Sequence, residues 1–366
     1  MNSITARFSR TDQTDFFRTL NSRVNAYFNE RHLSKFGNWK LYIKSAVVFV
    51  IYLTPYFLIL SNNFNQWVML VLSMVIGAGM AFVGMCVMHD GNHGSYSRRK
   101  WVNNLMGSSI YILAGNIFNW KVQHNVLHHT YTNIDGYDED MNTGGVLRLS
   151  KHAEWKRFHK YQHIFGIFLY GLMTINWAIR KDYFQLRDYL RRGLSPGNKV
   201  NQTKEWTILI TTKALYLSIW VLLPILILDI AWWKVLIGFV VMHYTAGIIL
   251  SMVFQLAHIV EDTEMPLPDE KGNLKNTWAI HQLHTTADFA PKNWLVSWFV
   301  GGLNYQIEHH LFPHISHVHY PRISKIVKET AREFGLPYTE YRTVREALAS
   351  HFHMMKKLGQ RPEVVA

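Results

Sequence analysis

The chain has 366 residues, of which 49% are apolar, 14% aromatic and 17% charged, and its formal net charge is +13. A basic chain could bind nucleic acid. The sequence contains no recognisable nucleic-acid-binding motif, so we do not predict nucleic-acid binding. The single cysteine, Cys86, lies in an apolar run. It therefore excludes both a disulfide framework and a thiolate metal site.

The apolar residues are clustered in a way that predicts membrane spans. Residues 45 to 88 contain no Asp, Glu, Lys, Arg or His, and the polar segment SNNFNQ (61 to 66) divides them into two runs. Each run is about one bilayer span, because ~20 helical residues cover ~30 Å of hydrocarbon. A second pair of runs, 214 to 228 and 235 to 257, is divided by DIAWWK. The sequence therefore predicts four transmembrane helices in two hairpins.

The basic residues predict the orientation of these helices. Residues 1 to 44 carry eight Lys or Arg against three Asp or Glu, whereas the two short loops between the paired spans contribute only Lys234. The same polar N-terminal segment does not read as a signal peptide. Because short basic segments stay in the cytoplasm, both termini and the long middle region are predicted to be cytoplasmic.

Two further apolar segments, 101 to 120 and 164 to 179, are predicted to lie at the membrane surface without crossing it. A single crossing by either segment would place the histidine-rich segments on opposite sides of the membrane. Two soluble helices are expected in the tail, at roughly 321 to 334 and 339 to 357. Lys213, at the edge of the third span, is expected to extend its amine to the membrane surface.

The predicted fold is an all-α integral membrane protein with one domain covering residues 1 to 366. Its four spans carry a cytoplasmic helical cap formed by residues 89 to about 205 and 258 to 366. We expect this cap to hold a histidine-rich site for two metal ions.

Histidines at helical spacing support that metal site. In HDGNH and HNVLHH, pairs four residues apart lie on one helical face, so their imidazoles can share a metal. QIEHH adds a third cluster, and the last span ends at a further histidine. Eight imidazoles are too many for one tetrahedral zinc and suit two ions. The candidate ligands are His89, His93, His124, His128, His129, His258, His309 and His310, with Gln306 in or beside the shell.

The other histidines have less specific interpretations. Six are expected to be solvated or to cap helices: His32, His152, His159, His163, His351 and His353. His243 is expected near the far leaflet with a structural role. Positions at the surface or behind the ligands are expected for His281, His284, His314, His317 and His319.

Acidic residues beside the clusters could accept the second N–H of a ligating imidazole, which fixes its tautomer. The candidates are Asp90, Asp138, Asp140, Glu261 and Glu308. The same carboxylates could instead cap helices or offset nearby Lys and Arg, so both interpretations stay open.

HDGNH, HNVLHH and QIEHHLFPH, in this order, resemble the three histidine boxes of the membrane-bound fatty acid desaturases. The similarity runs from about residue 40 to residue 335. Glutamine in place of the first histidine of the third box is typical of the front-end branch, whose members insert a double bond between an existing one and the carboxyl end. The resemblance points to a delta-6-type enzyme acting on an acyl-CoA or acyl-lipid.

The resemblance also implies a di-iron centre on the box histidines, dioxygen as co-substrate and a cis double bond as product. No HPGG haem-binding motif occurs, so the electrons are expected from a separate ferredoxin or cytochrome b5. The implied location is a bacterial cytoplasmic membrane or the endoplasmic reticulum. The basic face could steer an acidic electron donor or hold anionic lipid.

Two other functions stay open. An acyl-lipid or sphingolipid hydroxylase of the same superfamily would use the same boxes. A membrane metal transporter would need ionisable residues along its spans, where the sequence offers only His243 and Lys213. Trp120, Trp278 and Trp294 could line an acyl tunnel, although anchoring at the membrane interface is the more common role of tryptophan.

Overall fold

Four long apolar helices form one side of the molecule in the computed structural model, which describes residues 6–10, 15–197 and 199–362. The second and third helices are each built from three consecutive segments. Their bounds are α2 (Trp39–Leu60); α3 (Gln66–Val83) with η1 (Gly84–Met88) and α4 (His89–His93); α11 (Gln202–Leu217) with η6 (Ser218–Leu222) and α12 (Leu223–Ile227); and α13 (Trp232–His258). All four are long and apolar enough to cross a membrane, which confirms the predicted number.

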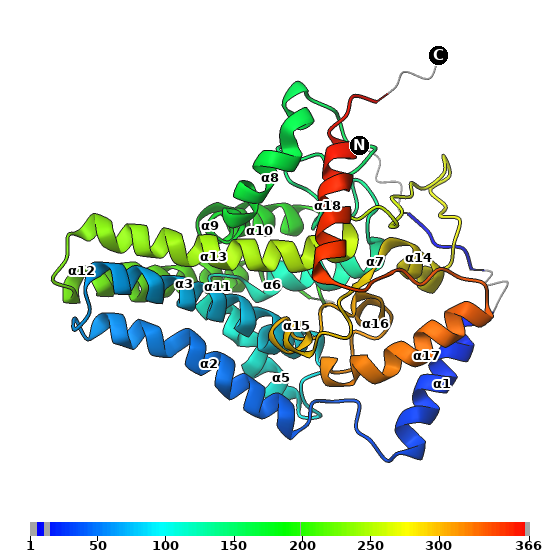
Figure 1. Cartoon of the computed structure of the whole chain (residues 1–366), viewed down its shortest axis with the longest axis horizontal. Helices are drawn as coiled ribbons and strands as arrows, with labels where there is room; N and C mark the ends of the chain where they lie inside the picture. The colour runs from blue at the N-terminus through cyan, green and yellow to red at the C-terminus, as the bar shows by residue number, and fades with distance from the viewer. Residues whose placement is uncertain (1–5, 11–14, 198, 363–366) are drawn as a thin grey trace.

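The long helices lie side by side because small residues allow close approach (Figure 1). α3 packs against both α2 and α13. A Cβ added at Gly77 would collide with the backbone carbonyl of Met242 on α13, and one added at Gly79 would collide with the backbone of Tyr52 on α2. The connections α2–α3 and α12–α13 also meet, since Asn62 Nδ2 donates to Asp229 Oδ2 at 2.5 Å.

Shorter elements surround one end of the long helices and cover their flank (Figure 1). Twelve α-helices belong to this set within the described residues, together with short 3-10 and π-helical turns. The helices before α13 are α1 (Phe16–Glu30), α5 (Lys100–Gly107), α6 (Ile117–Trp120), α7 (His129–Tyr131), α8 (Gln162–Gly171), α9 (Met173–Asn176) and α10 (Asp182–Arg191). The turns are η2 (Ser108–Leu113), η3 (Lys121–His128), η4 (Arg157–Tyr161), η5 (Trp177–Lys181) and η7 (His317–His319).

After α13 come α14 (Trp278–Thr285), α15 (Trp294–Phe299), α16 (Gln306–Leu311), α17 (Tyr320–Glu333) and α18 (Val344–Leu358). The last two correspond to the two predicted tail helices, although α18 begins a few residues later than expected. Of the two embedded segments, the second folds as α8 and α9, which pack against α13. Neither segment forms a fifth long apolar helix in the described part of the chain.

A small sheet corrects the all-α prediction. β1 (Asp288–Phe289) and β2 (Glu340–Tyr341) pair in parallel, and the backbone N–H of Asp288 donates to Thr339 O at 2.9 Å. The chain after α14 is buried, so its backbone groups need partners, and the segment before α18 supplies them. Strands of two residues are too short to produce an alternating sequence pattern.

The structure also corrects the prediction that Lys213 extends its amine to the membrane surface. Its amine does not reach the membrane surface, because the third long helix begins at Gln202 and the side chain is 3% exposed. Its Nζ lies 2.6 Å from Asp182 Oδ2 and donates to Trp177 O at 2.8 Å. The buried carboxylate partner removes the need for the amine to reach water.

Candidate metal centre

Four imidazoles converge where the second long helix ends. His89 and His93 stand one turn apart on α4, directly after the π-helical turn η1. His124 comes from η3 and His309 from α16. One ring nitrogen of each lies within 4.8 Å of the others. Three elements separated in sequence therefore build one group with the donor number of a metal site.

A second group of three imidazoles lies next to the first. It combines His128 of η3, His258 at the last position of α13 and His310 of α16, all fully buried. Their ring centroids are 4.8 to 5.0 Å apart. His124 and His128 also approach the carboxylate of Asp140 closely enough to form a third, mixed group.

His129 lies between the two imidazole groups. Its ring centroid is 4.6 Å from that of His309 and 4.4 Å from that of His310. Its Nε2 is 3.3 Å from Nε2 of His124. The structure thus brings together all eight histidines that the sequence put forward as ligands.

Several nitrogens in this cluster are buried without a hydrogen-bond partner among the described residues. They are Nε2 of His93, His128, His258, His309 and His310. An unpaired buried nitrogen costs about 1–3 kcal/mol, and five in one place would be unfavourable in an ordinary core. Metal ions would bind these lone pairs, so the donor set fits the metal that the spacing predicts.

The opposite ring nitrogen of most of these imidazoles is held by a partner. Nδ1 of His128 lies 3.0 Å from Asp138, and Nδ1 of His124 lies 3.3 Å from Asp140. Because an N–H at Nδ1 leaves the Nε2 lone pair free, these contacts orient the rings as ligands. Three more Nδ1 atoms have partners: Gln282 for His310, Tyr320 for His309 and the Thr285 carbonyl for His258.

Burial keeps most of the cluster in the neutral form that binds metal. Burial and the neighbouring imidazoles hold the pKa of His129, His309 and His310 well below the usual histidine range. Burial also lowers the pKa of His124 to about 4, although Asp140 opposes the shift. His128 differs: burial lowers its pKa, but the carboxylates of Asp138 and Asp140 together outweigh burial and raise this pKa above the usual histidine value.

The five predicted acidic partners divide into two sets. Asp138 and Asp140 contact site imidazoles, and Asp90 Oδ1 lies 4.0 Å from Nδ1 of His89. Glu261 is 41% exposed and pairs with His353 instead. Glu308 is buried, but it accepts a hydrogen bond from Tyr338, whose hydroxyl also donates to Asp288. Glu261 and Glu308 therefore contact partners other than the candidate ligands, which favours the alternative interpretation for these two carboxylates.

His351 corrects one of the predictions for the six histidines expected to be solvated or to cap helices, because it is fully buried. His159 is also fully buried, but its Nδ1 accepts from Lys156 N at 3.0 Å and caps the start of η4, as expected. His351 Nδ1 donates to Ile259 O at 2.8 Å, and the Tyr170 hydroxyl lies 3.0 Å from its Nε2. The helix α18 thus uses this histidine to pack against α8 and α13. His32, His152 and His353 are exposed, and His163 is half-buried.

The remaining histidines lie behind or away from the two groups. His317 Nδ1 is 3.0 Å from Asp90, and His314 Nδ1 donates to the carbonyl of His93 at 3.1 Å. His243 lies buried in α13 between Tyr216 and Thr174. His281 contacts Thr132 O, His284 contacts Glu264 and His319 contacts Phe36 O.

Gln306 begins α16, and its buried Oε1 has no hydrogen-bond partner among the described residues. Its membership of a metal shell stays a prediction. Trp120 stacks 4.6 Å from His124, and Trp278 Nε1 donates to His129 O, so both lie at the site. Trp294 is exposed.

Fold and site together define a helical membrane protein with a histidine-rich site suited to metal ions. A family model described as fatty acid desaturase matches residues 65–342. The chain belongs to the fatty acid desaturase family and is an acyl desaturase, which confirms the resemblance seen in its motifs.

Three relatives illustrate the similarity. The chain is 36% identical to an sn-1 linoleoyl-lipid 6-desaturase of Arthrospira platensis, over 100% of this chain and 98% of the relative. A protein of the same name from Synechocystis is 35% identical over 97% and 98%. An acyl-lipid (8-3)-desaturase of Physcomitrium patens is 34% identical over 97% of this chain and 74% of the relative. These names support the front-end branch.

Proposed function

We propose that the chain inserts a cis double bond at position 6 of a linoleoyl-type chain carried by a membrane lipid. The names of two relatives aligned over nearly their whole length support the position and the lipid carrier. The single observation that carries the chemistry is the convergence of buried, unpaired imidazole nitrogens from three histidine boxes and His258.

The metal centre would consist of two iron ions. His89, His93, His124 and His309 would hold one ion, and His128, His258 and His310 the other, with His129 between them and Gln306 beside them. Iron with dioxygen and two electrons supplies an oxidant strong enough for a methylene C–H bond. No side-chain acid or base can remove that hydrogen at a usable pKa.

The protein's own groups orient the ligands and keep water out. Asp138, Gln282 and Tyr320 each engage the Nδ1 side of one ligand ring, so the Nε2 side faces the interior of the cluster. All three partners come from outside the helix that carries their histidine. The rings are therefore fixed in place before any metal or acyl chain binds.

The membrane arrangement follows the charge of the chain. We propose that the four long helices cross as two hairpins, with both termini and the histidine site on the cytoplasmic side. Residues 89 to 205 and 258 to 366 would form one cap on the same domain. The membrane would be a bacterial cytoplasmic membrane or the endoplasmic reticulum.

Electrons would come from a separate ferredoxin or cytochrome b5. A chain with net charge +13 attracts an acidic donor, and this attraction weakens as salt is added. Anionic lipid around the cap would compete for the same basic residues.

Product analysis tests the proposed function. The chain is expressed in a host without polyunsaturated lipids, linoleate is supplied, and new double bonds are located by mass spectrometry. We expect a new bond at position 6, its loss in His309→Ala, and its retention in His353→Ala, because His353 is 66% exposed. A bond on the methyl side of the existing ones, or a hydroxylated product, would contradict the proposal.

A further inference from the structure

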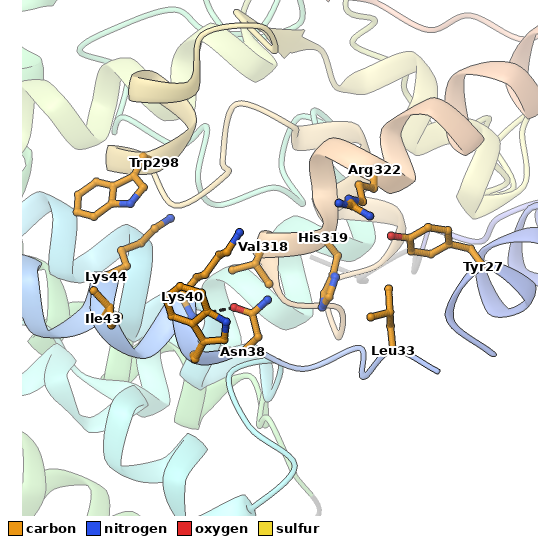
Figure 2. A pocket seen from close by; sticks show the side chains of 11 residues that line it. Tyr27, Leu33, Asn38, Lys40, Ile43, Lys44, Trp298, Val318, His319 and Arg322 are labelled. Atoms are coloured by element: carbon orange, nitrogen blue, oxygen red, sulfur yellow. Dashed lines mark hydrogen bonds between the residues drawn. The ribbon is translucent and has the colours of Figure 1, made fainter. Parts of the chain in front are cut away.

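A cavity of about 520 Å³ opens where the first long helix begins. It lies between the start of α2, the turn η7 with the start of α17, and Trp298 of α15 (Figure 2). Asn38, Lys40 and Lys44 line one side, and His319 and Arg322 line the other. None of these residues belongs to the imidazole groups, so the cavity is separate from the metal centre.

The charged side chains that line the cavity are all positive. Lys40, Lys44 and Arg322 line it, and no Asp or Glu does within the described part of the chain. Lys44 donates to a neutral acceptor, Nε2 of His317, at 2.9 Å. Lys40 lies over the ring of Trp39, with Nζ 5.8 Å from the ring centre. Three cations therefore share one cavity without a carboxylate in ion-pair contact, which favours an anionic ligand.

The N-termini of two helices add to the positive potential in the cavity. α2 has 22 residues and begins beside the cavity, where Asn38 Oδ1 accepts a hydrogen bond from Lys40 N at 3.0 Å. α17 has 14 residues and begins directly after His319. The start of each helix carries a partial positive charge, which attracts a phosphate.

The cavity lies at the level expected for lipid headgroups. Trp39 is 66% exposed and Ile43 55% exposed on the first turns of α2, so one wall continues into the apolar surface of a predicted span. Tryptophan at the end of an apolar helix is typical of the membrane interface. A ligand in this cavity could keep its acyl chains in the bilayer while its headgroup meets the cations.

A short series of side chains links the cavity to the metal centre. Lys44 contacts His317, and His317 Nδ1 lies 3.0 Å from Oδ2 of Asp90. Asp90 is the immediate neighbour of His89 in α4. An enzyme that acts near the carboxyl end of an acyl chain needs its headgroup site close to its metals, and this cavity satisfies that condition.

We propose that this cavity binds the phosphate of the acyl lipid that the enzyme desaturates, with Lys40 and Arg322 as the principal contacts. The inference rests on the proposed function and narrows its substrate to phosphate-bearing lipids. Neutral sugar lipids would lack the group that the three cations and two helix starts recognise.

Binding is tested on the full-length protein without any need for metal or turnover. The protein is placed in a series of nanodiscs of neutral galactolipid with rising fractions of phosphatidylglycerol carrying brominated acyl chains, and quenching of tryptophan fluorescence is followed. We expect the double variant Lys40→Gln/Arg322→Gln to need at least roughly tenfold more phosphatidylglycerol for half-maximal quenching, because each of the two lost charge-assisted contacts is worth about one factor of ten.

Lys325→Gln is the matched control, since Lys325 is exposed on α17 but does not line the cavity. The tryptophan fluorescence of this variant should be quenched to the same extent as that of the parent protein. Equal quenching by brominated galactolipid in the parent protein, or an unchanged curve in the double variant, would overturn the inference. Arg322→Lys together with Lys40→Arg keeps the charges and should restore most of the binding.

Turnover then separates the possible substrates. For linoleoyl-phosphatidylglycerol we expect KM to rise at least roughly tenfold in the double variant while kcat stays within twofold. A KM shift confined to linoleoyl-coenzyme A would assign the cavity to the phosphates of that carrier. It would overturn the inference that the bound phosphate belongs to a lipid. If no lipid were desaturated, the proposed function would be wrong. The quenching measurement would still decide whether the cavity binds lipid phosphate.

Discussion

Gln282 of α14 connects two of the predicted ligand histidines, which come from different elements. Its Oε1 lies 2.8 Å from Nδ1 of His310, and its Nε2 donates to the carbonyl of His129. The same Oε1 also accepts from the Thr132 hydroxyl. One fully buried amide therefore sets the tautomer of His310 and the position of the second histidine box.

We expect Gln282→Leu to lower iron retention and desaturation together, by about 10- to 100-fold, because the leucine removes the nearer acceptor of His310 Nδ1 and leaves only Thr132 Oγ1 at 3.3 Å. Iron content of the purified protein and the rate of product formation are the measurements. Gln282→Glu keeps an acceptor oxygen and should retain more of both. Gln360→Leu, at an exposed position, is the control. Full iron content in Gln282→Leu would rule out this role.

Spacing predicted the histidines that meet in the two imidazole groups, but only some of the side chains that hold these imidazoles in place. The histidines within HDGNH and HNVLHH are only a few residues apart, so their spacing is visible in the sequence. Gln282 and Tyr320 act across the fold, and no local pattern marks them. Glu308 looked like a support because it precedes His309, but neighbouring residues on a helix point about 100° apart. That rotation turns Glu308 away from the imidazoles toward Asp288 and Tyr338.

At the scale of elements, hydropathy identified the long helices because their apolar runs match the thickness of a bilayer. Hydropathy could not predict where the third long helix begins, because the first part of this helix contains the charged residues Lys204, Glu205 and Lys213. π-Helical turns were not predictable either, although η1 leads into His89 and η3 carries His124 and His128. Such turns are frequent at functional sites, where they change the direction of side chains.

The pair of Lys213 and Asp182 joins the third long helix to α10. Asp182 also accepts from Trp177 Nε1 and from Asn119 Nδ2, and Asn119 lies on α6, which leads into η3. We expect Asp182→Ala to lower the free energy of unfolding by about 3–5 kcal/mol, because it leaves a buried amine without its partner. Denaturation of the solubilised protein measures the change.

The exposed pair of Lys328 and Glu340 is the matched control for this prediction. Lys328→Ala should cost only about 0–1 kcal/mol, since water screens the pair. The double variant Asp182→Leu/Lys213→Met should recover most of the loss, because it removes both buried charges. Equal losses in Asp182→Ala and Lys328→Ala would show that the buried pair has no special role.

At the scale of the whole molecule, the orientation predicted from charge is testable because Cys86 is fully buried and is the only cysteine. An added exposed cysteine therefore reports its own side of the membrane. A membrane-impermeant maleimide should label Asn63→Cys in intact cells, and it should label Lys199→Cys and Lys356→Cys only after the cells are opened. The reverse pattern would place the histidine site outside the cytoplasm.

Iron analysis of the active protein tests most directly the claim that the paired imidazole groups drive the reaction. We predict two iron ions per chain, one for each group, and a rate of desaturation proportional to the iron content. His310→Ala should lower both, because His310 belongs to the second group and stacks against His129. Active protein that contains zinc and no iron would contradict the account.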